Sequence, residues 1–239
     1  MDTVETAPAP CVPNTPSTPL KNRTSSPRVE CPGASCDGWR KAKSGVVACS
    51  CRAEKYLRSA LPTRFHRSRL QDIGRDVQLA VDKWLAKPGD GLFVVGPAGT
   101  GKTHLACAIV RWRWEHGRRA IFQRAAEFFA TIRESYDQST SERAVMEPLL
   151  TASMLVLDDL GSGSMSDHER RFALELLDRR GNSLLPTVVT SNWSLSEISE
   201  RMDDRIASRL AAFTSIELRG RDRRVQKGET GGAKSPCGK

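Results

Sequence analysis

The eight residues GPAGTGKT, at positions 96–103, constrain what this chain can fold into more than any other stretch. They fit the pattern G-x-x-x-x-G-K-[ST], follow the apolar run Leu92–Val95 and open a run with helical character. In that setting the pattern predicts a strand, a phosphate-binding loop and a helix, and hence an α/β protein with a parallel sheet. The alternative is a glycine-rich turn that matches by chance, which the flanking strand and helix disfavour.

Each fixed position of this loop has a physical reason. Its glycines permit positive φ and bring backbone N–H groups to phosphate oxygens, while the N-terminus of the following helix adds positive potential. Lys102 is expected to act as a point charge on the β and γ phosphates, and Thr103 to offer its hydroxyl to Mg²⁺. The predicted phosphate-binding residues are Gly96, Pro97, Ala98, Gly99, Thr100, Gly101, Lys102 and Thr103.

Length and composition fit one domain with extensions. The 239 residues suffice for a core without covalent staples. Residues 1–28 are rich in proline and poor in aliphatic side chains, so we expect a disordered leader there and a short disordered tail at 228–239. The chain has neither a signal-peptide pattern nor a run of about 18 apolar residues, so a cytoplasmic protein without a membrane segment is expected.

The formal charge of +9 is concentrated in the runs RFHRSR at 64–69, RWRWEHGRR at 111–119 and RGRDRRVQK at 219–227. Clustered Lys and Arg favour a polyanionic partner, because neutralising phosphates releases counterions. A solvated surface explains any single run equally well. Three runs beside a nucleotide site favour nucleic acid.

Four of the seven cysteines lie within 29–53, at Cys31, Cys36, Cys49 and Cys51. Two close pairs joined by a short loop suit a tetrahedral Zn²⁺ site, although the spacings C-x4-C and C-x-C depart from the commoner C-x2-C. Disulfides and unliganded thiols are the alternatives, and a reducing cytosol disfavours disulfides. We interpret 29–53 as a zinc module. The remaining cysteines, Cys11, Cys107 and Cys237, are expected not to be ligands.

The stretch ASMLVLDDLG, at 152–161, is an apolar run that ends in two carboxylates. It suits a buried parallel strand that delivers Asp158 and Asp159 at its carboxyl end, beside the phosphates. Asp158 is expected to hold Mg²⁺ through water, and Asp159 to orient or deprotonate the attacking water. One further strand at 119–123 between this run and the phosphate loop separates an ATPase of the additional-strand type from a simple nucleoside kinase.

Another apolar strand, PTVVTSN at 186–192, ends in Asn192. A neutral amide at that point can hydrogen-bond both the γ-phosphate and the lytic water. The alternative is an Asn that caps the helix beginning near Ser196. No Asn-Lys-x-Asp element follows, which disfavours a GTPase.

The segment 197–213 predicts an amphipathic helix, with apolar residues every fourth position from Ile198 to Leu210. Arg201, Arg205 and Arg209 repeat at the same interval on the adjoining face. Such arginines are usually solvated or paired with nearby carboxylates. The functional alternative is that one of them reaches the γ-phosphate held by a neighbouring subunit.

The motifs GPAGTGKTHLA, LVLDDLG, TVVTSN, RIASRL and GRDRR, in this order, resemble the AAA+ ATPases of the DnaC/DnaI helicase-loader and IstB transposition-helper group. The resemblance implies that Lys102 and Thr103 form Walker A, Asp158 and Asp159 Walker B, and Asn192 sensor 1. It also implies that Arg209 is the arginine finger and Arg224 is sensor 2. GRDRR has an Arg where many relatives have Tyr, and little chain follows it, so no large C-terminal lid is expected.

We therefore expect a three-layer α/β ATPase with a parallel five-stranded sheet at 71–227, joined by a linker at 54–70 to the zinc module. The resemblance implies ATP, Mg²⁺, ATP-dependent assembly with like subunits, and a replicative helicase and single-stranded DNA as partners. Its cysteine-bearing amino-terminal segment is similar to that of some DnaC-like loaders. One alternative is an IstB-like ATPase that assists a transposase on duplex DNA. The other is an adaptor that acts through the zinc module without hydrolysing nucleotide.

Overall fold

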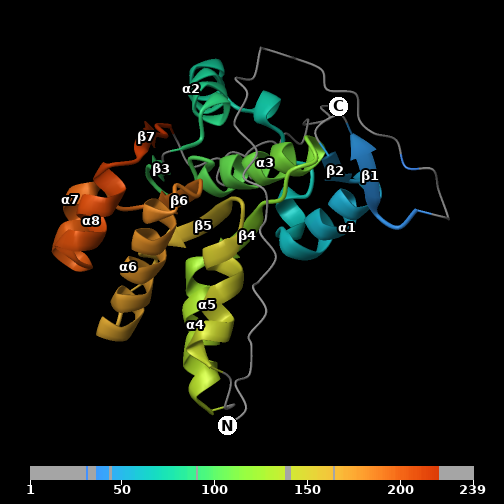
Figure 1. Cartoon of the computed structure of the whole chain (residues 1–239). Helices are drawn as coiled ribbons and strands as arrows, with labels where there is room; N and C mark the ends of the chain where they lie inside the picture. Colours follow the sequence, from blue (N-terminus) through green and yellow to red (C-terminus); the bar gives the residue numbers. More distant parts are fainter. Residues whose placement is uncertain are drawn as a thin grey trace, which may run out of the picture.

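A computed structural model describes residues 31, 36–42, 45–89, 91–137, 141–163 and 165–220. The expected leader and tail, and Arg224, lie outside these residues. Five strands form one parallel sheet in the order β4-β5-β6-β3-β7 (Figure 1). Their bounds are β3 Leu92–Val95, β4 Ile121–Arg124, β5 Leu155–Leu160, β6 Thr187–Ser191 and β7 Thr214–Glu217. The parallel five-stranded sheet expected from the sequence is confirmed.

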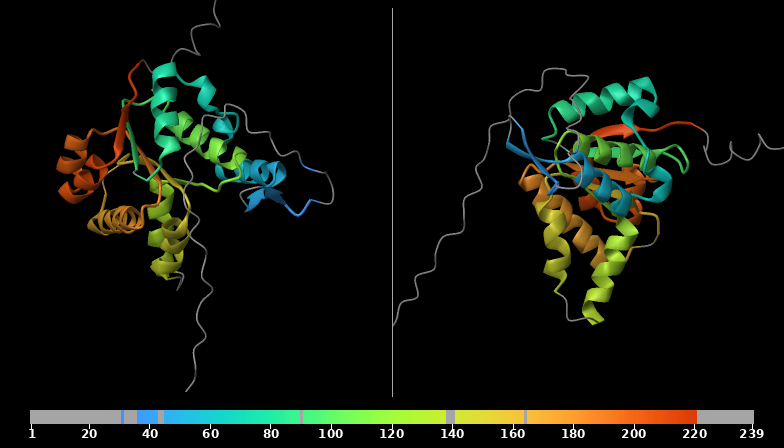
Figure 2. Two further views of the ribbon diagram at one scale, coloured as in Figure 1. Left: turned by 45° about the horizontal axis from the view of Figure 1, so that its top comes forward. Right: turned by 90° about the vertical axis from the view of Figure 1, so that its right-hand side faces the viewer.

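Helices cover both faces of this sheet (Figure 2). They are α1 Ser50–Ala60, α2 Arg75–Ala86, α3 Lys102–Glu115, α4 Ala125–Asp137, α5 Glu142–Thr151, α6 Asp167–Asn182, α7 Leu195–Arg201 and α8 Asp204–Ala211. The first three pack on one face and the other five on the opposite face, so the three-layer arrangement is also confirmed. Within the described part of the chain, no helix combines the length and apolar character that crossing a bilayer requires.

Strand β5 shows why the apolar runs are continuous rather than alternating. Val156 faces the core under α3, whereas Leu155 and Leu157 face the core under α4 to α8, and all three are fully buried. Successive side chains of a strand point to opposite faces, so a strand covered on both sides needs apolar residues at every position.

The segment before the sheet differs from the linker expected at 54–70. A small antiparallel hairpin, β1 Trp39–Ala42 and β2 Gly45–Ala48, leads into α1, whose Leu57 belongs to the main hydrophobic core together with Leu61. The apolar spacing of four residues along α1 gives it a buried stripe. Residues 54–61 therefore pack into the hydrophobic core on one face of the sheet and do not form a linker.

Helix α1 also contacts the edge of the sheet. The Tyr56 ring stacks on Trp114 of α3 with 4.6 Å between ring centroids. The Tyr56 hydroxyl accepts a hydrogen bond of 3.2 Å from the backbone N–H of Phe122, in the edge strand β4. Helix α1 thus shields that edge.

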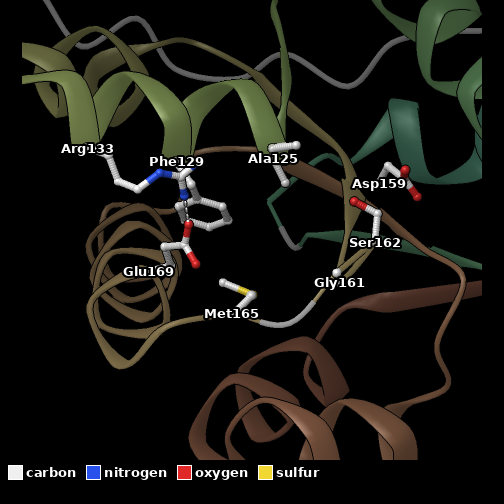
Figure 3. Close-up of a pocket in the computed structure, with 10 residues that line it drawn as sticks. Ala125, Phe129, Arg133, Asp159, Gly161, Ser162, Met165 and Glu169 are labelled. Carbon is white, nitrogen blue, oxygen red and sulfur yellow. Dashed lines mark hydrogen bonds and ion pairs between the residues drawn. The ribbon is translucent and has the colours of Figure 1, made fainter.

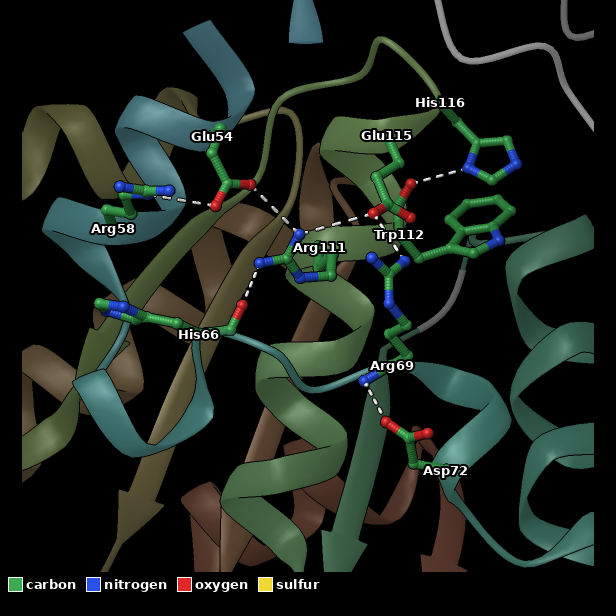
Figure 4. A network of polar contacts seen from close by, with 9 residues as sticks. All are labelled: Glu54, Arg58, His66, Arg69, Asp72, Arg111, Trp112, Glu115 and His116. Carbon is green, nitrogen blue, oxygen red and sulfur yellow. Dashed lines mark hydrogen bonds and ion pairs between the residues drawn. The ribbon is translucent and has the colours of Figure 1, made fainter. Parts of the chain in front are cut away.

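A network of charged side chains fastens α1 to α3 (Figure 4). Arg111 of α3 is buried and pairs with Glu54 of α1 at 3.4 Å and with Glu115 at 3.5 Å. Arg69 reaches Glu115 at 3.0 Å. Because Arg111 and its neighbour Arg113 are internal, only part of the basic run 111–119 can meet a polyanion.

On the other face, Arg180 of α6 is completely buried. Its guanidinium donates to the carbonyl oxygens of Ala152 at 2.9 Å and Pro186 at 2.8 Å, and to the hydroxyl of Thr187 at 2.8 Å. It also donates to the carbonyls of Leu149 and Leu150. Burial lowers the pKa of Arg180 to about 10. One side chain thereby caps the end of α5 and the start of β6.

Candidate nucleotide-binding site

The loop between β3 and α3 has the backbone that a phosphate cradle needs. Gly96, Gly99 and Gly101 have φ of 156°, 77° and 106°. A Cβ on Gly96 would lie 2.2 Å from the carbonyl oxygen of Leu218, so this position admits only glycine. Two independent constraints, positive φ and close backbone approach, therefore explain the first residue of the motif.

Lys102 and Thr103 begin α3 directly after this loop. The Lys102 ammonium donates to the carbonyl oxygens of Gly96 at 2.7 Å and Pro97 at 2.8 Å, so it is folded over the loop. Thr103 Oγ1 donates to Asp158 Oδ2 at 3.0 Å. This contact joins two residues that are 55 positions apart. It agrees with the prediction that the phosphate loop and the end of β5 lie together at the carboxyl ends of the strands.

The two carboxylates leave β5 at an irregularity. The register of β5 on β6 runs from Leu157 opposite Val189 to Leu160 opposite Ser191, so β5 has one extra residue there. Asp159 takes φ of 61°, a left-handed conformation that Asp tolerates better than most residues. A β-bulge of this kind re-aims side chains, which gives Asp158 and Asp159 different directions.

The two acidic residues have different surroundings. Asp158 is 2% exposed, and burial raises the pKa of its carboxyl above the ordinary value, although hydrogen bonds from Thr190 and Thr103 oppose this. Asp159 is partly exposed, and its Oδ1 accepts a hydrogen bond of 3.0 Å from Asn192 Nδ2. The predicted sensor amide therefore contacts the predicted catalytic carboxylate.

Two residues near the carboxylates were not identified from the sequence. Thr190 of β6 donates to Asp158 Oδ1 at 2.7 Å and accepts from the Asp159 backbone N–H at 2.8 Å. Arg124 ends β4 opposite Asp158, and its positive charge opposes the rise in the pKa of that carboxyl that burial causes. The sequence signal that could have identified them is a polar residue near the carboxyl end of β4 and of β6, the two strands beside β5.

The donor set fits a magnesium nucleotide. The Thr103 hydroxyl and the Asp158 carboxylate lie together, and hard oxygen ligands of this kind suit Mg²⁺. The glycine cradle leads directly into the start of α3, and these two features suit phosphate. The phosphate-binding residues were predicted from the loop at 96–103, and Asp158 was predicted from the stretch 152–161.

A pocket of about 200 Å³ lies next to Asp159 (Figure 3). Its wall comes from the first half of α4, from the loop after β5, and from Glu169 of α6, which is paired with Arg133. Gly161 in that wall has φ of 88°, and a Cβ there would lie 2.5 Å from the Trp193 ring. Asp159 thus borders a space large enough for water.

The three arginines of segment 197–213 do not share one helix. The helix is interrupted at Met202, so Arg201 is the last residue of α7 whereas Arg205 and Arg209 lie on α8. Each is exposed and paired within the chain: Arg201 with Glu197 at 3.8 Å, Arg205 with Asp203 at 3.1 Å, and Arg209 with Asp178. The break follows from Asp203, whose side chain caps α8. The single continuous helix predicted there is wrong.

The four amino-terminal cysteines converge. The sulfur atoms of Cys31, Cys36, Cys49 and Cys51 all lie within 4.8 Å of one another, and none of these four is in a disulfide. A tetrahedral Zn²⁺ with Zn–S of ~2.3 Å places its sulfurs about 3.8 Å apart, so the cluster is close to that geometry.

The thiols of this cluster contact one another and the nearby backbone. The backbone N–H of Gly38 donates to Cys36 Sγ at 3.3 Å, and the sulfurs of Cys36 and Cys51 are 3.5 Å apart. The contact with Cys36 raises the pKa of Cys51 to about 12. A cation that binds here must displace the thiol protons, so the convergence of the four sulfurs, and not the pKa, is what indicates a metal site.

Comparison with known proteins gives relatives of two kinds, helicase loaders and an ATP-binding protein of an insertion sequence. The family described as IstB-like ATP binding protein matches residues 70–212. The replicative helicase loader DnaC of Escherichia coli strain K12 is 28% identical over 122 residues, which are 51% of this chain and 50% of that protein. The ATP-binding protein of insertion sequence IS21 from Pseudomonas aeruginosa is 26% identical over 144 residues, 58% of this chain and 54% of that protein.

A solved structure shows the same fold. The crystal structure of the DnaC helicase loader matches with a TM-score of 0.60 at 24% identity, and the match covers 66% of this chain and 100% of that one. The chain spans about half the length of the curated relatives it matches. The family match takes up more than half of the chain, and with the phosphate loop in place it identifies an AAA+ P-loop protein. The chain belongs to the family of IstB-like ATP binding proteins.

Proposed function

We propose that this protein is a cytoplasmic AAA+ ATPase that loads a replicative helicase onto single-stranded DNA. ATP binding drives assembly with like subunits and the helicase, and hydrolysis releases the partner. One observation carries the ATPase assignment: polar side chains from the carboxyl ends of three strands lie together at one end of the sheet. These side chains are Lys102, Thr103, Asp158, Asp159 and Asn192. The assignment to a loader rests on the likeness to DnaC.

The residues divide the work between binding and positioning. The backbone amides of the loop and Lys102 hold the β and γ phosphates, and Lys102 exchanges its two carbonyl partners for phosphate oxygens. Thr103 and Asp158 hold Mg²⁺, which neutralises phosphate charge when it is bound. Lys102 and the loop therefore supply affinity, whereas Asp158 supplies metal dependence.

Asp159 is the group placed to orient or deprotonate the attacking water. Its carboxylate is held by Asn192 at 3.0 Å and borders the pocket beyond β5. Asn192 keeps one further donor hydrogen for the γ-phosphate or the water. The adaptor without hydrolysis is disfavoured by this arrangement, because a purely structural nucleotide needs no oriented carboxylate.

The second candidate is an ATPase that assists a transposase on duplex DNA. The likeness to the ATP-binding protein of insertion sequence IS21 favours it, and so does the family description. Both candidates use the same nucleotide site, so the residues of that site do not distinguish them. The two candidates differ in the DNA they bind, which is single-stranded for the loader and duplex for the transposition helper.

The discriminating experiment measures DNA binding in the ATP-bound state. The Asp159→Asn variant is expected to retain ATP, because Asp158 still serves Mg²⁺, and to hold the assembled state. Fluorescence anisotropy with a labelled oligonucleotide should show tighter binding to the single strand than to the duplex, and both should weaken steeply with salt. Preferential duplex binding, with filaments in electron micrographs, would transfer the assignment to the transposition helper.

Arg209 is predicted to act on the nucleotide of a neighbouring subunit. Arg209→Ala should bind ATP with near-normal affinity and lose about 10³-fold or more in turnover, because an arginine finger acts mainly in the transition state. Mixing Arg209→Ala with Lys102→Ala subunits should restore part of the activity. Arg201→Ala and Arg205→Ala are the matched controls. A wild-type rate for Arg209→Ala that is independent of protein concentration would remove the assignment.

The cysteine cluster is predicted to hold one structural Zn²⁺, so its residues form the metal-binding part of 29–53. Protein purified under reducing conditions without chelators should contain about one zinc per chain by metal analysis. Cys49→Ser combined with Cys51→Ser should remove the zinc without abolishing nucleotide binding, because the phosphate loop lies on other elements. Cys107→Ser, within α3, is the control and should keep the metal. Zinc-free wild-type protein would contradict the assignment.

A further inference from the structure

Thr190 occupies a position that the ATPase motifs do not assign. It lies in the central strand β6, is 0% exposed, and touches both acidic residues of β5. We propose that Thr190 is a positioning residue that holds Asp158 and Asp159 in their working arrangement. This inference rests on the proposed ATPase function.

The direction of the two hydrogen bonds follows from the chemistry of the groups. The Asp159 backbone N–H can only donate, so the Thr190 hydroxyl oxygen accepts there, at 2.8 Å. The single hydroxyl hydrogen is then available for Asp158 Oδ1, at 2.7 Å. One hydroxyl thus uses its donor and an acceptor site at once, which fixes its own rotamer.

Asp158 is consequently held at both oxygens. Thr103, at the start of α3, donates to Oδ2, and Thr190 donates to Oδ1. The carboxylate therefore bridges the phosphate-loop helix and β6. With both oxygens engaged, its plane has little freedom to turn.

Thr190 also stabilises the bulge that aims Asp159. The extra residue of β5 lies between Leu157 and Leu160, and Asp159 takes φ of 61° there. A left-handed conformation is unfavourable for a non-glycine residue and persists only where its surroundings hold it. The hydroxyl of Thr190 gives the Asp159 amide a partner in that conformation. Two residues after Thr190, just beyond the end of β6, Asn192 holds the carboxylate of Asp159.

Thr190→Val keeps the shape of the side chain and removes the hydroxyl, so it isolates this role. We expect kcat for ATP to fall about 10- to 100-fold, the range found when groups that orient a metal site are removed. The KM for ATP should stay within about threefold, because Lys102 and the loop amides are untouched. Thr190→Ser retains the hydroxyl and should recover most of the rate.

Ser191→Ala is the matched control. Ser191 is the next residue of β6 and is fully buried. Its hydroxyl donates to the Leu160 carbonyl at 2.7 Å and accepts from the Trp193 backbone N–H at 3.0 Å, so its hydrogen bonds run to backbone groups outside the two carboxylates. It should lose stability like Thr190→Val while keeping kcat. Equal losses of kcat in both variants, or a Thr190→Ser variant as slow as Thr190→Val, would overturn the proposal.

A second readout does not depend on activity. Amide hydrogen exchange of the peptide 155–161 in nucleotide-free protein should be faster in Thr190→Val than in wild type and Ser191→Ala, because the Asp159 amide loses its acceptor. Thr190→Ala gives the same comparison should Thr190→Val fold poorly. Unchanged exchange in both Thr190 variants would refute the contact. Wild-type protein without ATPase activity above Lys102→Ala would refute the proposed function instead, and the exchange result would stand by itself.

Discussion

Lys102→Ala is expected to abolish ATP hydrolysis and to weaken ATP binding about 10- to 100-fold, the range for a lost charge-assisted hydrogen bond. The ammonium lies over the loop, 2.7 Å and 2.8 Å from the carbonyls of Gly96 and Pro97, so it is already where phosphates would bind. Lys102 is the first residue of α3, and its removal opens no apolar core, so the melting temperature should change by no more than about 3 °C. Isothermal titration with ATP, a steady-state ATPase assay and thermal melting measure the three quantities.

The matched control for this variant is Lys83→Ala. Lys83 lies in α2, is exposed, and takes no part in the phosphate loop. It should keep both ATP affinity and turnover. Near-normal hydrolysis by Lys102→Ala would remove the assignment of this loop as the phosphate site.

Arg180→Met is expected to give the largest loss of stability. It leaves the carbonyls of Leu149, Leu150, Ala152 and Pro186 without their buried donor. Buried polar groups without partners cost ~1–3 kcal/mol each, and relief of the buried charge offsets part of this. We expect the free energy of unfolding to fall by about 3 kcal/mol and the melting temperature by about 6–12 °C. Urea unfolding followed by circular dichroism measures the change.

Two variants define what Arg180 contributes. Arg180→Lys keeps a charge with fewer donors and should fall between wild type and Arg180→Met. Arg179→Met is the neighbouring control; Arg179 is exposed, pairs only with Glu175 at 3.3 Å among the described residues, and should cost less than about 0.5 kcal/mol. Equal stability of Arg180→Met and wild type would mean that the carbonyl cluster does not need a donor.

The sequence predicted the strands and the loop well because their signals are local. The phosphate loop follows from spacing and glycine content, and the buried strands follow from continuous apolar runs with polar ends. The contact between Thr103 and Asp158 was predictable from the same logic, since carboxyl ends of parallel strands meet at one edge.

Other features were not predictable because they depend on partners far away in the chain. The bulge in β5 is visible only from its register on β6, so Thr190 could not be linked to Asp158 in advance. Arg111 and Arg113 belong to a run that reads as a basic surface, but α3 turns them inward, where Arg111 pairs with Glu54 and Glu115. Charge counted along a sequence does not show which side of a helix it lies on.

Helix α1 begins at the cysteine cluster and ends in the hydrophobic core beside the sheet, and this shared element has a consequence for aggregation. Strand β4 is an edge strand, and Tyr56 occupies the Phe122 amide that another chain could otherwise pair with. Uncovered edges of this kind are templates for intermolecular sheets. A chain shortened to begin at Leu61 would therefore leave strand β4 open to pairing with another chain, and it would also lose the cysteines. By holding the start of α1 in place, the cysteines would therefore help to prevent self-association through β4.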